Sequence, residues 1–189
     1  MTDRRERGTL DAARRPIVLV GMMGSGKSAV GNALAAQVGL PFRDTDAAIV
    51  DASRMSVAEI FARDGEAFFR DRETEVLRRL LAMGPGVLST GGGVFLRPVN
   101  RRAIRAAGTS VWLRASPDLL WSRVKGKTTR PLLMTGDPRA TLDGLIRDRA
   151  PHYAKACVVF ECEPGLAVEA TAARLAERLR RAGRLPEAA

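Results

Sequence analysis

A glycine-rich segment near the start of the chain has residue types that suit phosphate binding. The residues from Gly21 to Ser28, GMMGSGKS, fit the pattern G-x-x-x-x-G-K-[ST] and follow an apolar run that ends at Val20. Glycines let successive backbone N–H groups curl around phosphate oxygens, and a following helix adds the positive end of its dipole. Lys27 can then reach the β- and γ-phosphates, and the Ser28 hydroxyl can ligate Mg²⁺. A turn that binds nothing would not explain these two side chains, so the segment predicts a nucleoside triphosphate site.

This phosphate loop does not by itself identify the acceptor of the phosphoryl group. GTPases, motor ATPases and small-molecule kinases all use such a loop. The sequence has no apolar run ending in D-x-x-G after the loop and no N-K-x-D motif, which disfavours a switch GTPase. A chain of 189 residues also leaves little room for the additional elements of a motor or helicase.

Two further clusters follow apolar runs. Asp44-Thr45-Asp46 comes after a short run near Phe42, and Gly91-Gly92-Gly93 comes after the run Gly86–Thr90. In a parallel sheet, ligands bind at the edge where the carboxyl ends of the strands meet. Two carboxylates separated by one residue can face a metal ion and a hydroxyl, although aspartate also favours a helix N-cap. Consecutive glycines allow close approach of a ligand or expose N–H groups, and a flexible turn is the alternative.

Three arginines could meet an anionic ligand. Arg70 falls in the helical pattern Glu66–Met83, where the pattern taken alone favours a solvated charge. Arg130 lies in Lys125–Arg139, a segment with two glycines, two prolines and four basic residues, and Arg149 follows that segment. A connection this long is either a functional lid or a surface segment without fixed structure. We favour a lid, because its cations could then meet the anion.

Five short apolar runs predict the strands that must position these residues. They lie near Phe42 and at Pro16–Val20, Gly86–Thr90, Thr109–Leu113 and Cys157–Phe160. Runs without polar alternation are typical of buried parallel strands, and helical patterns between them indicate βαβ units. The sequence therefore predicts a three-layer, doubly wound α/β fold with a five-stranded parallel sheet. We expect a disordered N-terminal arm over residues 1–15 and a single domain over residues 16–189, with a mobile lid at about 125–139.

The composition limits the partners of the chain. The formal net charge is +10, from 31 Lys and Arg against 21 Asp and Glu. Only four of these cations are lysines and the arginines are scattered from end to end, so specific nucleic-acid binding is not indicated. No apolar run approaches the roughly 20 residues that span a bilayer, and the first residues lack the apolar stretch of a secretory signal. Two cysteines are too few for a disulfide framework, so we expect a cytoplasmic protein. We also expect a monomer.

Six motifs taken together resemble the shikimate kinase family. They are the phosphate loop, DTD at 44–46, FR at 69–70, GGG at 91–93, RPLL at 130–133 and RAPHY at 149–153, in the order and at the spacing of that family. The resemblance covers roughly Ile17 to the end of the chain. It implies a fold like that of P-loop nucleoside monophosphate kinases. It also implies transfer of the γ-phosphoryl group of ATP to the 3-hydroxyl of shikimate, which gives shikimate 3-phosphate and ADP on the route to chorismate and aromatic amino acids.

The resemblance also implies roles for individual residues. ATP would be bound by Gly24, Ser25, Gly26, Lys27, Ser28, Ala29, Arg123 and Arg130. One Mg²⁺ would be held by Ser28 and Asp44. Shikimate would be bound by Asp46, Arg70, Gly91, Gly92, Gly93 and Arg149, with the two arginines on its carboxylate. The catalytic residues would be Lys27, Asp46 and Arg130, with Asp46 orienting or deprotonating the attacking oxygen and Arg130 meeting the transferring phosphoryl group.

The match leaves one contact and two other readings open. The loop after the last predicted strand is short and acidic, and Pro164 is our candidate for packing on the adenine base. Another small P-loop kinase, such as a gluconate kinase, would share the phosphate loop but should not need Arg70 and Arg149 around three glycines. A basic ATP-binding regulator of nucleic acid is the alternative from a different class, and salt-sensitive binding to DNA or RNA would distinguish it.

Overall fold

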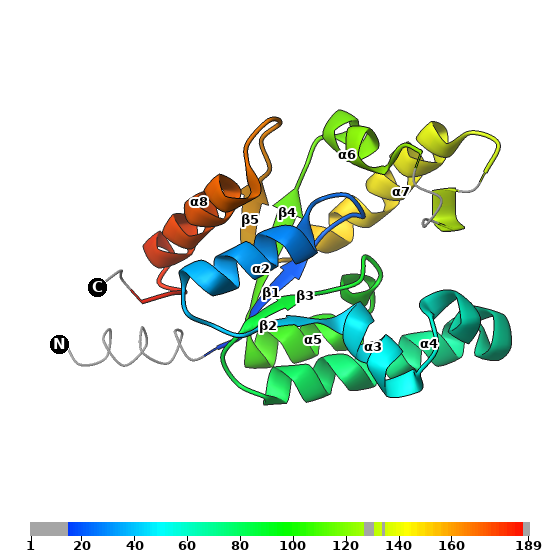
Figure 1. Ribbon diagram of the computed structural model, residues 1–189, viewed down its shortest axis with the longest axis horizontal. Helices are drawn as coiled ribbons and strands as arrows, with labels where there is room; N and C mark the ends of the chain where they lie inside the picture. Colours follow the sequence, from blue (N-terminus) through cyan, green and yellow to red (C-terminus); the bar gives the residue numbers. More distant parts are fainter. Residues whose placement is uncertain (1–14, 127–130, 134, 187–189) are drawn as a thin grey trace.

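The computed structural model describes residues 15–126, 131–133 and 135–186 (Figure 1). Its elements in chain order are β1 (Ile17–Val20), α2 (Lys27–Gln37), β2 (Phe42–Asp44), α3 (Thr45–Ser53), α4 (Val57–Ala82), β3 (Val87–Ser89), the 3-10 helix η1 (Val94–Leu96), α5 (Pro98–Ala107), β4 (Thr109–Arg114), α6 (Pro117–Val124), the 3-10 helix η2 (Pro131–Leu133), α7 (Pro138–Tyr153), β5 (Val158–Glu161) and α8 (Val168–Arg181). The N-terminal arm expected over residues 1–15 lies almost entirely outside the described residues, as do Arg130 and part of the expected lid.

The five described strands form one parallel sheet in the order β2-β3-β1-β4-β5. Each of the five apolar runs in the sequence corresponds to one strand, so the prediction of a doubly wound α/β fold is confirmed. The register pairs Leu19 of β1 with Ser89 of β3, and Asp44 of β2 with the same Ser89. The phosphate loop, the DTD segment and the triple glycine therefore leave the sheet side by side at one edge.

Helices cover both faces of the sheet (Figure 1). The side chains of β1 alternate between these two faces. Ile17 and Leu19 belong to a buried cluster with side chains of α2 and α8, whereas Val18 and Val20 belong to a second cluster with side chains of α4, α5 and α7. All four side chains are fully buried. Burial on both faces explains why the run has no polar alternation.

Helix α4 contains the candidate site residue Arg70 and has two parts. It begins with a capping box, in which the Ser56 hydroxyl accepts from the backbone N–H of Glu59 and the Glu59 carboxylate accepts from that of Ser56. Gly65 interrupts the helix with φ 80° and ψ 171°, a conformation that side chains rarely adopt. The second part begins at Glu66, as the sequence predicts. None of the helices in the described ranges is long and apolar enough to cross a membrane.

Candidate active site

The phosphate loop has the backbone conformation that its glycines allow. Gly24 and Gly26 have φ values of 79° and 93°, in the left-handed region, and Gly26 is the N-cap of α2. A Cβ on Gly24 would also lie 2.7 Å from a methyl carbon of Val124 and 3.3 Å from the carbonyl oxygen of Leu120. Both the conformation and the close packing therefore require glycine at this position.

Lys27 spans the loop from its first helical turn. Its ammonium donates to the carbonyl oxygens of Gly21 at 3.0 Å and Met22 at 2.9 Å. On the other side, Nη1 of Arg123 donates to the carbonyls of Gly24 at 3.2 Å and Ser25 at 3.4 Å. Lys27 and Arg123 thus donate to carbonyl groups of the phosphate loop and also line the hollow that the loop encloses, where an anion would be bound.

That hollow is a cavity of about 630 Å³. Its lining contains the phosphate loop from Met23 to Val30, together with Asp44, Asp46, Ser89, Thr90, Gly91, Gly92, Arg123, Cys162, Glu163, Leu166, Val168 and Thr171. The predicted ATP residues Gly24 to Ala29 and Arg123 are all among them. Pro164 is exposed and does not belong to this lining. Leu166, in the same connection between β5 and α8, and Val168, the first residue of α8, supply apolar surface that the sequence does not single out.

Asp44 caps α3 with one carboxylate oxygen and faces the phosphate loop with the other. Its Oδ1 accepts from the backbone N–H groups of Asp46 at 2.9 Å and Ala47 at 3.3 Å, which makes it the N-cap of α3. Its Oδ2 accepts from the Ser28 hydroxyl at 2.8 Å, and that hydroxyl lies 3.0 Å from Oγ of Ser89. Hard oxygen ligands at the phosphate loop fit Mg²⁺, which keeps several waters and shares phosphate oxygens.

Asp46 and Glu73 come together at the triple glycine. A Cβ on Gly91 would lie 2.7 Å from Oδ1 of Asp46 and 3.3 Å from Oε1 of Glu73. Burial raises the pKa of Glu73, the Arg70 charge and its hydrogen bond oppose that rise, and the Asp46 charge adds to it. Glu73 is not among the site residues predicted from the sequence, and its 1% exposure has no local signal there.

Arg70 is held in place and is not a solvated charge. Its Nη1 donates to both carboxylate oxygens of Glu73 at 3.0 and 3.1 Å, and its Nε and Nη2 donate to Glu66 at 3.3 Å. The guanidinium carbon lies 5.3 Å from the ring centroid of Phe69. A Cβ on Gly93 would lie only 2.3 Å from Nη1 of Arg70, so the guanidinium fits against the bare backbone of that glycine.

Arg149 approaches the same turn from α7. A Cβ on Gly92 would lie 3.5 Å from its Nη1. Arg70 and Arg149 also share a second cavity, of about 540 Å³, whose other lining residues are Glu66, Ala67, Asp71, Gly93, Leu96 and Arg97. Three guanidinium groups in one cavity suit a small anion such as a carboxylate. Because Gly91 and Gly92 line the first cavity and Gly93 lines the second, the two cavities adjoin at this turn.

Comparisons with known proteins show the family to which the chain belongs. A family model described as shikimate kinase matches residues 23–180. The chain is 55% identical over 161 residues to a shikimate kinase of Ruegeria pomeroyi, covering 84% of this chain and 83% of the relative, and 53% identical over 166 residues to a shikimate kinase of Cereibacter sphaeroides, covering 88% and 83%. Among solved structures, it is similar to a shikimate kinase from Acinetobacter baumannii in complex with shikimate, with a TM-score of 0.86, 33% identity and coverage of 92% of this chain and 97% of the other.

Proposed function

The chain belongs to the shikimate kinase family, and we propose that it transfers the γ-phosphoryl group of ATP to the 3-hydroxyl of shikimate. The observation that carries this proposal is that Arg70 and Arg149 both line one cavity and both lie against the triple-glycine turn, Arg70 at Gly93 and Arg149 at Gly92. That turn separates the cavity of the phosphate loop from the cavity that holds the two arginines. A phosphoryl donor and an anionic acceptor bound in these cavities would meet at Asp46.

In this proposal the first cavity binds ATP. The backbone from Gly24 to Ser28 would surround the phosphates, and Lys27, which now holds the carbonyls of Gly21 and Met22, would turn its ammonium to phosphate oxygens. Arg123 would keep the loop in this shape through the Gly24 carbonyl. The apolar surface of Leu166 and Val168, and not the exposed Pro164, would face the adenine base.

Ser28 and Asp44 would hold Mg²⁺, since their oxygens lie 2.8 Å apart at the mouth of the phosphate loop. A bound magnesium ion neutralises charge on the phosphates during transfer. Because Oδ1 of Asp44 is engaged by two N–H groups of α3, the carboxylate is fixed with Oδ2 directed at the Ser28 hydroxyl. The site would therefore be formed before the metal binds.

The second cavity would bind the shikimate carboxylate between Arg70 and Arg149, with the backbone of Gly91 to Gly93 against the ring. Planar guanidinium groups bind a carboxylate with two parallel hydrogen bonds, which fixes the orientation of the acid as well as its position. Asp46 lies against Gly91 at the other end of this turn. It would accept a hydrogen bond from the attacking hydroxyl and hold that oxygen in line with the phosphoryl group.

Arg130 lies outside the described residues and keeps the role that the family resemblance gives it, contact with the transferring phosphoryl group. Closure of residues 125–139 over the two cavities would bring it there and exclude water, which suppresses hydrolysis of ATP. The closing lid and a monomeric enzyme remain predictions.

A panel of acceptors tests the proposed function. ADP release would be followed with ATP, Mg²⁺ and either shikimate, gluconate or a nucleoside monophosphate at equal concentrations. We expect turnover with shikimate and a rate near background with the other two, because gluconate is an open chain that does not hold its carboxylate and a hydroxyl at a fixed spacing, and a nucleoside monophosphate has no carboxylate for the two arginines. Turnover of gluconate without turnover of shikimate would contradict the proposal.

A further inference from the structure

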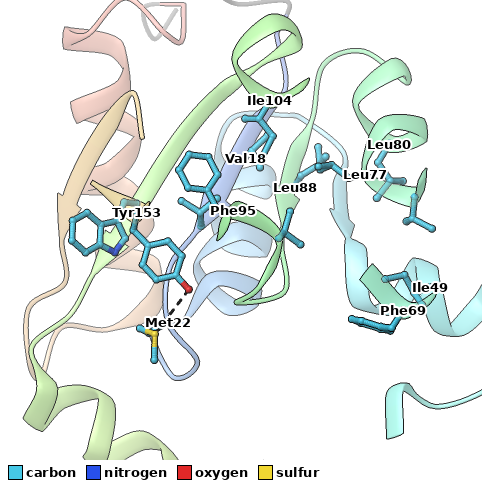
Figure 2. Packing of buried hydrophobic residues seen from close by; sticks show 14 of the residues in the cluster. Val18, Met22, Ile49, Phe69, Leu77, Leu80, Leu88, Phe95, Ile104 and Tyr153 are labelled. Atoms are coloured by element: carbon cyan, nitrogen blue, oxygen red, sulfur yellow. Dashed lines mark hydrogen bonds between the residues drawn. The ribbon is translucent and has the colours of Figure 1, made fainter. Parts of the chain in front are cut away.

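Tyr153 is buried where the phosphate loop, the triple-glycine turn and α7 meet. The residue is 1% exposed and its ring centroid lies 5.9 Å from that of Trp112. Its hydroxyl donates to the carbonyl oxygen of Gly92 at 2.6 Å. The dashed line in Figure 2 marks the longer contact of the same hydroxyl with Sδ of Met22, at 3.9 Å. A phenol has one proton to donate, and the carbonyl is the nearer and stronger acceptor. The hydroxyl is therefore committed to the glycine turn.

The peptide that Tyr153 holds lies between the two arginines. The carbonyl of Gly92 belongs to the planar peptide that joins Gly92 to Gly93, so fixing the oxygen fixes the whole unit. Nη1 of Arg149 lies 3.5 Å from the Cβ position of Gly92, and Nη1 of Arg70 lies 2.3 Å from that of Gly93. Both guanidinium groups thus pack against the same peptide unit. Without the hydrogen bond from Tyr153, the two glycines would have wide conformational freedom.

We propose that Tyr153 is a positioning residue for the acceptor carboxylate: by holding the Gly92 carbonyl, it keeps Arg70 and Arg149 at the spacing that a carboxylate needs. This inference rests on the proposed function and adds a residue to it. Tyr153 touches neither substrate in this account. It acts through the turn and through the two arginines that contact the substrate.

The electrostatics of the site support a permanent donor at this position. Burial raises the pKa of Tyr153 to about 12, although the charge of Arg149 and its hydrogen bond to the phenol act in the opposite direction. The hydroxyl therefore keeps its proton throughout the neutral range, where it can donate to Gly92. An uncharged phenol also leaves the positive charge of Arg149 available for an anionic ligand.

The substitution Tyr153→Phe tests the inference, because it keeps the ring beside Trp112 and removes the hydroxyl, with its hydrogen bond to Gly92 and its contact with Arg149. An unsatisfied buried carbonyl is expected to loosen the turn, and we expect the KM for shikimate to rise about tenfold or more. The KM for ATP should stay within about twofold, because the phosphate loop contacts the hydroxyl only through Met22 at 3.9 Å. Equal increases in both KM values, or no increase for shikimate, would overturn the inference.

A substrate without the carboxylate charge makes the test specific. The methyl ester of shikimate should lose much of its affinity for the wild-type enzyme, and Tyr153→Phe should add little further loss for this ester. Such non-additivity is the mark of two groups that act through one interaction. Fully additive losses would mean that Tyr153 does not act on the carboxylate clamp.

Two further proteins separate positioning from general loosening. Asn100→Leu removes another buried side-chain bond to the same segment, from Nδ2 to the Val94 carbonyl at 3.0 Å, away from the arginines. It should leave the shikimate KM within about twofold, and a rise equal to that of Tyr153→Phe would overturn the inference. Replacement of Tyr153 by 4-aminophenylalanine, which restores a donor, should return the KM toward the wild-type value. The wild-type rate with shikimate tests the proposed function separately, since it does not depend on these variants.

Discussion

Gly93→Ala is a substitution whose effect follows directly from the geometry of the site. Gly93 has φ −88° and ψ −21°, which any residue can adopt, so the backbone tolerates a side chain there. The new Cβ would, however, lie 2.3 Å from Nη1, 2.7 Å from Cζ and 2.9 Å from Nη2 of Arg70. Since that side chain is flexible, we expect the guanidinium to move rather than the fold to change.

The size of the effect can be estimated from the contacts that the moved guanidinium would lose. A hydrogen bond between charged groups contributes about 1.5 to 3 kcal/mol. Loss of one such contact with the shikimate carboxylate corresponds to a rise of about 10- to 150-fold in KM. The turnover number should change little, because the carboxylate is bound equally in the ground state and the transition state. The free energy of unfolding should stay within about 1 kcal/mol of the wild-type value, as for most substitutions that only displace a partly exposed side chain.

Steady-state kinetics with each substrate varied in turn would measure these quantities, and urea denaturation would measure stability. Gly92→Ala is the matched control, because its Cβ would meet Arg149 at 3.5 Å, an ordinary contact distance. Its shikimate KM should rise less than that of Gly93→Ala. A wild-type shikimate KM for Gly93→Ala, in a folded protein, would refute the role of Arg70 and the packing argument together.

Three other changes test separate parts of the site. Asp44→Asn should raise the Mg²⁺ concentration for half-maximal activity about tenfold, because it weakens the oxygen pair with Ser28, and an unchanged requirement would remove Asp44 from the metal site. Burial raises the pKa of Glu73 above its ordinary value of 4.5. Between 4.5 and the raised pKa, the folded state therefore binds more protons than the unfolded state, and the free energy of unfolding falls as the pH rises through this range. Glu73→Gln should flatten this fall in urea denaturation at several pH values, and an equal slope would contradict the assignment. A thiol reagent at neutral pH should label the exposed Cys157 and spare the buried Cys162, and peptide mass mapping can check this. Partial desolvation opposes ionisation of the Cys157 thiol, but hydrogen bonding with Ser110 and nearby arginine charges outweigh it and lower the pKa of this thiol. Burial raises the pKa of the Cys162 thiol to about 11.

The elements with local signals are the ones that the sequence predicts well. The pattern from Gly21 to Ser28 requires left-handed backbone at Gly24 and Gly26, and the structure has it there. The apolar runs mark the strands because both faces of the sheet are buried. The sequence gives a weaker signal for the end of the first part of α4 before Gly65. The separate helical pattern from Glu66 onward correctly predicts the second part of this helix.

Contacts between distant segments are not visible in the sequence. Arg70 by itself suits a solvated position, and only the packing of α4 against the glycine turn buries Glu73 beside it. Tyr153 is 61 residues from Gly92 along the chain, so no local pattern indicates their hydrogen bond. The prediction for Pro164 rests on residue type alone, and which residues line the cavity, Leu166 and Val168 among them, depends on the fold of the connection after β5.

The most direct test of the account is the identity of the product. The enzyme would be incubated with shikimate and ATP, with and without Mg²⁺, and the product analysed by mass spectrometry and by ³¹P–¹H correlation NMR. We predict one phosphorylated product, with the phosphorus coupled to the proton at carbon 3 of shikimate, formed only when Mg²⁺ is present. Phosphate on another hydroxyl, or ADP formation without any phosphorylated shikimate, would contradict the account.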